Sequence, residues 1–144
     1  MSRKFVLIVF ALTLNTVLLA QELSEHLFKD RILIILVDDI TNPYFKKQKE
    51  ELIKNLPGMK ERKIITYIAT PKGYKKGLKD SGPWHNSTEL YEIYSADNRG
   101  FEIILIGLDG GVKKRETEVF KIDDIFNLID GMPMRRAEIR NRQN

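Results

Sequence analysis

The stretch FEIILIGLDGGVKKRETEVFKIDDIFNLIDGMPMRR, residues 101–136, decides the fold. An apolar run over 103–107 is followed by Leu108-Asp109-Gly110-Gly111 and then by a polar, strand-like run from Val112. Asp-Gly between two such runs is a strong hairpin signal, because Gly accepts the positive φ of a tight turn. Apolar residues then recur at helical spacing at positions 122, 125, 126 and 129. The stretch predicts a β-hairpin followed by a helix.

The first twenty residues have the pattern of a secretory signal peptide. Ser2-Arg3-Lys4 is a short positive segment, residues 5–20 are almost wholly apolar, and Ala20 is a small residue suited to a cleavage point. The run is short for a membrane span, which needs about 20 apolar residues, so an uncleaved anchor is the less favoured alternative. We therefore expect a periplasmic or extracellular protein, cleaved near Ala20, with residues 21–144 forming a single domain.

Charge and cysteine content narrow the partners and the chemistry. The chain has a formal net charge of +4, and removing Arg3 and Lys4 with the leader lowers it to +2. So small an excess of positive charge gives no reason to expect a nucleic-acid partner. The chain has no cysteine, which excludes disulfides, a lipid-anchoring cysteine and any thiol-based reaction.

The first half of the expected domain has the pattern of a βαβ unit. RILIILV, residues 31–37, is a continuous apolar run that suits a central strand buried on both faces. Asn42-Pro43 then opens a helix, since Asn is a favoured cap and Pro a favoured first residue, and Pro57-Gly58 is expected to end it. Residues 63–70 form a second strand, which we expect to lie parallel to the first through a right-handed connection.

The second half adds a long loop, a short helix, the hairpin and a last helix. Residues 71–86 are rich in Pro, Gly and Lys and predict a loop, and Asn86 or Ser87 is the expected cap of the next helix. The hairpin's second strand, 112–117, carries lysines of the kind that protect an edge. A basic tail, 133–144, closes the chain. The element order, β-α-β, loop, α, β-β-α, predicts a cysteine-free α/β thioredoxin-like three-layer sandwich.

The residues 104–113 and 125–136, ILIGLDGGVK and IFNLIDGMPMRR, resemble the signature of domain-of-unknown-function family 4174. Members of that family are small exported bacterial proteins, and a similar domain occurs in animal extracellular matrix proteins of the sushi-repeat and coiled-coil-domain type. The resemblance implies a thioredoxin-like fold close to that of peroxiredoxins in outline. It implies no activity, and Lys121 stands where a small hydroxyl residue is expected to cap the last helix.

The loop after the first strand is the first candidate site. In a thioredoxin-like fold the redox cysteines lie there, because a helix N-terminus lowers a thiol pKa. Here the positions hold Asp38, Asp39, Thr41 and Asn42, so the loop is either structural or a small binding pocket. Two carboxylates also suggest a hard cation, although Ca²⁺ takes six or more oxygens. The residues identify no metal site and no cofactor.

Trp84 and the tail arginines are the other candidates. Trp84 lies in a Gly- and Pro-containing loop and is either a partner anchor or a cover for the edge of the core. Arg135 and Arg136 either bind an anionic lipid, polysaccharide or acidic protein, or they cap the preceding helix and pair with Asp130 and Glu138. His85 has only His26 as a companion in the sequence, and no spacing supports a metal or acid–base site.

Three functions follow from these observations. The leading one is an exported, non-redox binding or interaction module, whose partner is an envelope or extracellular protein or an anionic surface. The second is a cation-dependent envelope enzyme that uses Asp38 and Asp39 with Thr41. The third is a structural role, in which the domain packs into a larger assembly through its hairpin edge.

Overall fold

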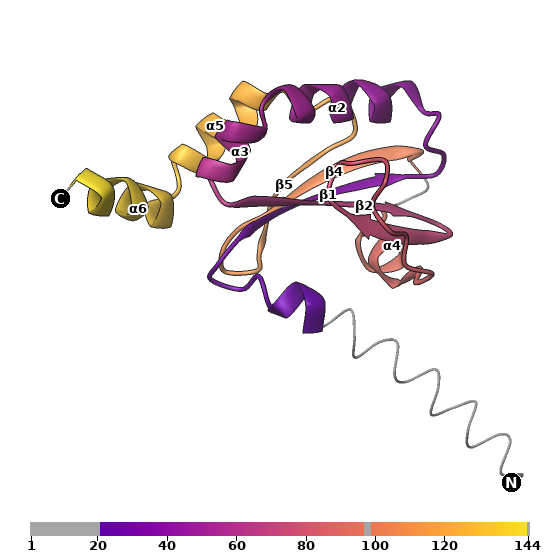
Figure 1. Cartoon of the computed structure of the whole chain (residues 1–144), viewed down its shortest axis with the longest axis horizontal. Coiled ribbons are helices and arrows are strands. Elements are labelled where there is room, and N and C mark those ends of the chain that lie inside the picture. Colours follow the sequence, from indigo (N-terminus) through magenta and orange to yellow (C-terminus); the bar gives the residue numbers. More distant parts are fainter. Residues whose placement is uncertain (1–20, 97–98, 144) are drawn as a thin grey trace, which may run out of the picture.

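A computed structural model describes residues 21–96 and 99–143 of the chain, and the predicted signal peptide lies outside them. It contains a five-stranded mixed sheet in the order β3-β2-β1-β4-β5. Helices α2, α3 and α5 cover one face of the sheet, and α4 lies on the other (Figure 1). None of the helices in the described ranges is both long enough and apolar enough to cross a membrane.

The βαβ unit is confirmed. β1 (Arg31–Val37) is buried along its whole length and pairs in parallel with β2 (Ile64–Thr70), from Arg31 opposite Ile64 to Leu36 opposite Ala69. Helix α2 (Pro43–Lys54) connects the two strands, and the side chain of Asn42 accepts hydrogen bonds from its first backbone N–H groups. The predicted cap and the proline at the first helical position therefore start the helix as expected.

The predicted hairpin is also confirmed. β4 (Phe101–Ile106) lies antiparallel to β1, and β5 (Val112–Glu116) lies antiparallel to β4 at the edge of the sheet. Gly110 has a φ of 78° in the connecting turn, a conformation that L side chains rarely adopt. β5 exposes most of its side chains, as expected of a charged strand that resists further pairing.

The sheet separates two apolar clusters. Alternate residues of β1 and β4 point to opposite faces, so Leu33 and Ile103 pack beneath α2 and α5, whereas Ile34 and Ile104 pack towards α4. Leu52 of α2 and Ile125 of α5 (Ile122–Asp130) are fully buried in the first cluster. The core strands β2-β1-β4-β5 have α2 and α5 on one face and α4 on the other. This is the thioredoxin-like arrangement that the element order predicts.

The sequence predicts that Pro57-Gly58 ends the first helix, but the structure places both residues inside a second, short helix. α2 ends at Lys54, and a short helix, α3 (Leu56–Glu61), starts two residues later with Pro57 in its first turn, where the missing N–H costs nothing. Gly58 serves packing here: a Cβ at this position would lie 2.6 Å from the ring of Phe126. The glycine thus lets α3 approach α5 closely.

The predicted loop 71–86 contains a fifth strand. β3 (Gly73–Lys76) lies antiparallel to the second half of β2, and the strand was missed because its residues are mostly Gly and Lys. The side chain of Lys75 is nevertheless buried and donates to the carbonyl of Lys79 at 2.5 Å. The next helix, α4 (Glu89–Tyr94), also begins later than predicted, with Thr88 rather than Asn86 or Ser87 at its cap.

Both ends of the described chain contact the rest of the domain. The basic tail forms a helix, α6 (Pro133–Gln143), beside the end of α3. At the other end, the polar segment 21–29 also contacts the sheet. Residues 21–24 are helical, and the backbone N–H of Phe28 donates to the carbonyl of Leu108 at 2.7 Å.

Candidate functional site

The loop after β1 is exposed and organised by its own hydrogen bonds. Asp39 accepts from the backbone N–H of Thr41 at 2.8 Å, and Asn42 accepts from that of Tyr44 at 2.9 Å. The hydrogen bond from Thr41 holds the pKa of the Asp39 carboxyl below its usual value. The oxygens of Asp39 and Asn42 thus shape a turn and a helix start.

Asp38 joins this loop to α4. The Tyr91 hydroxyl donates a hydrogen bond to the Asp38 carboxylate. Burial, followed by that hydrogen bond and the carboxylate charge, raises the pKa of Tyr91 to about 12. Across residues 21–96 and 99–143, His, Asp and Glu form no group of three or more that could hold a metal ion.

The remaining predicted site residues lie elsewhere. Trp84 is partly exposed, and the Lys75 ammonium lies 5.6 Å from its ring centroid. Arg135 and Arg136 belong to α6, which lies at the opposite end of the domain from the start of α2 (Figure 1). The structure therefore brings together Asp38, Asp39, Thr41 and Asn42, but it joins neither Trp84 nor the two arginines to them.

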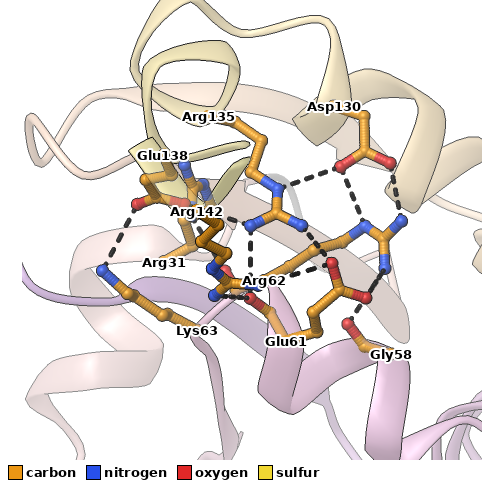
Figure 2. Close-up of polar contacts among 9 residues, drawn as sticks. All are labelled: Arg31, Gly58, Glu61, Arg62, Lys63, Asp130, Arg135, Glu138 and Arg142. Atoms are coloured by element: carbon orange, nitrogen blue, oxygen red, sulfur yellow. Dashed lines mark hydrogen bonds and ion pairs between the residues drawn. The ribbon is translucent and has the colours of Figure 1, made fainter. Parts of the chain in front are cut away.

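Arg135 is the centre of an ion-pair network between α6, α3 and the end of α5 (Figure 2). Its side chain is only 1% exposed and donates to Glu61 at 2.6 Å, Asp130 at 3.2 Å and Glu138 at 3.3 Å. Arg62 also binds Asp130 through two nitrogens, at 2.6 and 3.0 Å. The donors of Arg135 are thus used within the chain, whereas neighbouring Arg136 is exposed.

A second buried arginine, Arg31, brings β1 into this network. Arg31 is 1% exposed and donates to the carbonyl of Arg62 at 2.9 Å and to Glu138 at 3.4 Å. Burial opposes ionisation of Glu138, but the Arg31 charge and the hydrogen bond from Arg135 outweigh it and lower the pKa of Glu138. The network therefore fastens α6 to the start of the central strand.

A second polar cluster lies under the N-terminal segment. His26 is buried, with Nδ1 2.8 Å from the Asp30 carboxylate and Nε2 2.9 Å from the Tyr67 hydroxyl. The Lys76 ammonium lies 3.2 Å from Nε2. Glu22 accepts from Tyr67 at 3.2 Å. The cluster ties residues 22–30 to the sheet.

Glu22 accepts from a second buried tyrosine as well. The Tyr74 hydroxyl donates to its other carboxylate oxygen at 2.5 Å. Burial, reinforced by Glu22, raises the pKa of both Tyr67 and Tyr74 far above the usual range. Both phenols are therefore neutral donors to one carboxylate at any physiological pH.

A largely apolar groove with a volume of about 720 Å³ runs along the first half of β2. β3 pairs only with residues 67–70 of β2, and Gly77 adds one backbone hydrogen bond to Thr66. The strand edge at Ile64 and Ile65 is therefore left open towards α3. The groove is lined by Asp30, Ile53, Leu56, Met59, Lys60, Lys63, Ile64, Ile65, Thr66, Lys76, Gly77, Leu78, Lys79, Ser81 and Gly82.

The groove combines an apolar floor with a basic rim. Met59, Ile64 and Leu78 are buried core residues, while Ile53 and Leu56 remain 44% and 49% exposed. Four lysines line the groove, at positions 60, 63, 76 and 79, against the single carboxylate of Asp30. An exposed apolar surface edged by one sign of charge is typical of a binding site.

A second cavity, of about 620 Å³, lies at the start of α2, next to the loop 38–42. It is lined by Pro43, Tyr44, Lys47, Glu51, Glu118, Val119 and Lys121. The ring of Tyr44 stacks on Phe101 of β4, with 5.9 Å between centroids. Two lysines face two glutamates here, so the cavity has no preference for one sign of charge.

No sequence pattern predicts the groove, and only a weak one predicts the buried histidine. The groove's walls come from four segments, and their apolar residues read as ordinary core positions. His26 and Asp30 are four residues apart, a spacing that brings side chains together on a helical turn. The sequence alone indicates no partner for His26, and its pairing with Asp30 is seen only in the structure.

Comparison with known proteins agrees with this fold. The model of a family described as "Domain of unknown function (DUF4174)" matches residues 22–138. A search of curated proteins found no match. Among solved structures, the chain is similar to reduced 2-Cys peroxiredoxin from Plasmodium vivax, with a TM-score of 0.54 and 16% identity over 81% of this chain and 83% of that one. Peroxiredoxins have a thioredoxin-like fold, so the comparison supports the architecture alone.

Proposed function

This chain belongs to the DUF4174 family, and from that premise we propose that it is an exported, non-redox binding module. Its binding surface is the apolar groove beside β2. Export is supported by the signal-peptide pattern of residues 1–20. The non-redox character is supported by the sequence, because a chain without cysteine cannot carry out thiol–disulfide exchange or thiol-based peroxide reduction.

One observation carries the binding role: the open edge of β2 lies in a groove of ligand size. Its volume of about 720 Å³ falls within the range of roughly 300–1,000 Å³ that is usual for small-ligand pockets. Ile53 and Leu56 expose apolar side chains at its mouth. Leaving such surface in water is unfavourable, at about 25 cal/mol per Å², so a ligand that covers it gains affinity.

The groove supports this role better than the loop 38–42 does. Asp39 and Asn42 are already engaged by backbone N–H groups of the loop and of α2, and Asp38 is engaged by Tyr91. The groove offers what the loop lacks, which is a concave apolar surface with charged groups around it.

The test uses Nile red, an uncharged apolar dye whose fluorescence rises in apolar surroundings. We expect the purified domain, residues 21–144, to bind it at one saturable site. Leu56→Glu places a carboxylate at the mouth of the groove and is expected to weaken binding at least tenfold. Ile93→Glu is the matched control, because Ile93 is 64% exposed on α4 and does not line the groove.

Circular dichroism checks that both variants remain folded, as expected for changes at exposed positions. Equal dye binding by the wild type and by Leu56→Glu would show that the dye binds elsewhere and would overturn the proposal. Unsaturable binding by the wild type would do the same.

A further inference from the structure

The groove has a chemical selectivity beyond being apolar. Resting on the binding function proposed above, we infer that its occupant is a single-chain aliphatic carboxylate, a molecule of the fatty-acid class. The alkyl chain lies on the apolar floor along β2, and the carboxylate is held by the lysines of the rim. Shape, the kind of apolar side chain and charge each support this choice.

The floor is aliphatic. Its apolar side chains come from Ile, Leu and Met on α2, α3, β2 and the segment after β3, and within the described part of the chain no aromatic residue lines it. A planar aromatic ligand gains most from stacking on aromatic rings. A flexible alkyl chain instead gains from area alone, and Met59 adds a side chain that adapts to irregular shapes. This floor therefore suits a hydrocarbon chain.

The rim selects an anion. Lys60 extends from α3 on one side of the groove and Lys79 from the segment after β3 on the other. Lys76 also lines the groove, and its ammonium lies 3.2 Å from His26 Nε2. The Lys63 ammonium also forms an ion pair with Glu138 at 3.5 Å. Asp30, the one acid among the described residues that line the groove, pairs with His26. The rim keeps an excess of positive charge.

The donor type favours a carboxylate over a phosphate. No arginine is among the described residues that line the groove, and the planar fork of arginine is the group best matched to bidentate binding of phosphate. Lysine ammonium groups act as single point charges and suit one carboxylate at the end of a chain. The groove is walled by α3 and by residues 76–82, so it receives one chain rather than the surface of a bilayer.

The experiment is calorimetric titration of the domain with n-alkyl carboxylates of increasing length, below their micelle concentrations. Each additional buried methylene is expected to raise affinity about fourfold, from roughly 0.8 kcal/mol per methylene. The series should level off once the chain fills the groove. Alcohols and trimethylammonium ions of equal chain length are measured in parallel, and both are expected to bind more weakly than the carboxylate.

Charge reversal tests the rim. The double variant Lys60→Glu, Lys79→Glu is expected to lose about tenfold in carboxylate affinity while its affinity for the alcohol is unchanged. Lys114→Glu is the control, because Lys114 is on β5 at the opposite edge of the sheet. Added salt should weaken carboxylate binding and leave alcohol binding as it was.

The outcomes separate the two proposals. If the alcohol binds as tightly as the carboxylate, the anion inference is wrong and the apolar groove stands. If Nile red binds at the groove but no member of the alkyl series does, the fatty-acid inference alone fails. If an acidic, apolar peptide binds along the open edge of β2 while the carboxylates do not, the occupant is a peptide strand and the inference is likewise overturned.

Discussion

Replacing Arg135 by alanine should destabilise the whole domain, whereas replacing its neighbour Arg136 should not. Arg135 is 1% exposed and reaches Glu61, Asp130 and Glu138 at the junction of α3, α5 and α6. Its removal leaves three carboxylates without one of their partners. It also removes a buried alkyl stem that packs at the junction.

The magnitude follows from what each carboxylate retains. Removing one partner of a buried ion pair usually costs about 3–5 kcal/mol. Asp130 keeps two hydrogen bonds from Arg62, Glu138 keeps Arg31, and Glu61 is 51% exposed and can be rehydrated. The loss should therefore lie at the lower end, at about 3 kcal/mol, which corresponds to a fall of roughly 12 °C in Tm for a domain of this size.

Urea unfolding followed by circular dichroism measures this loss, and Arg136→Ala provides the control. Arg136 is exposed, and no ion pair found among the described residues includes it, so its substitution should stay within about 0.5 kcal/mol. A loss below about 1 kcal/mol for Arg135→Ala, or equal losses for the two variants, would show that the network does not stabilise the fold.

Three further predictions follow. Burial opposes ionisation of Asp130, but hydrogen bonds from Arg62 and Arg135 lower its pKa below the usual value, so it stabilises the fold above the unfolded-state pKa of about 4 and less as pH falls further. Acid titration of unfolding should therefore show a steeper loss below about pH 4 in the wild type than in Asp130→Asn, and parallel curves would contradict this. Glu22→Ala leaves the Tyr67 and Tyr74 hydroxyls without their acceptor and should cost about 1–3 kcal/mol in urea unfolding; an unchanged midpoint would argue against the cluster. Because Asp38 and Asp39 are engaged within the chain, melting curves should be the same with and without Ca²⁺, Mg²⁺ or Mn²⁺, and a shift lost in Asp39→Ala would favour the cation-dependent enzyme.

The sequence predicts the parts of the fold that local patterns determine. The run 31–37 is apolar without interruption, so its central position follows from the need to bury both faces. Asn42-Pro43 starts a helix through its own side chain and ring, and Gly110 supplies the turn conformation. Each of these signals acts over a few residues and needs no partner far along the chain.

Long-range pairing determines what the sequence did not reveal. β3 forms by pairing with β2, and its own residues do not have the pattern of a strand. Its Lys75 is buried because the ammonium donates to the Lys79 carbonyl. For Arg135 the sequence offered pairing with Asp130 as one alternative, but its hydrogen bond to Glu61, 74 residues away, depends on the fold. The groove depends on four segments at once. Analogy with thioredoxin-like folds predicts a functional site at loop 38–42, but the fold alone does not determine where the site lies.

The fastening of residues 22–30 to the sheet determines where an expressed fragment of this protein should begin. A fragment that starts at Arg31 would keep every strand and each helix from α2 to α6. It would lose Glu22 and His26, leave two buried tyrosine hydroxyls without Glu22 as acceptor, and remove Leu23 from the apolar cluster it packs against. A fragment bounded by the strands and main helices alone would thus omit these contacts, whereas a start at Gln21 keeps them.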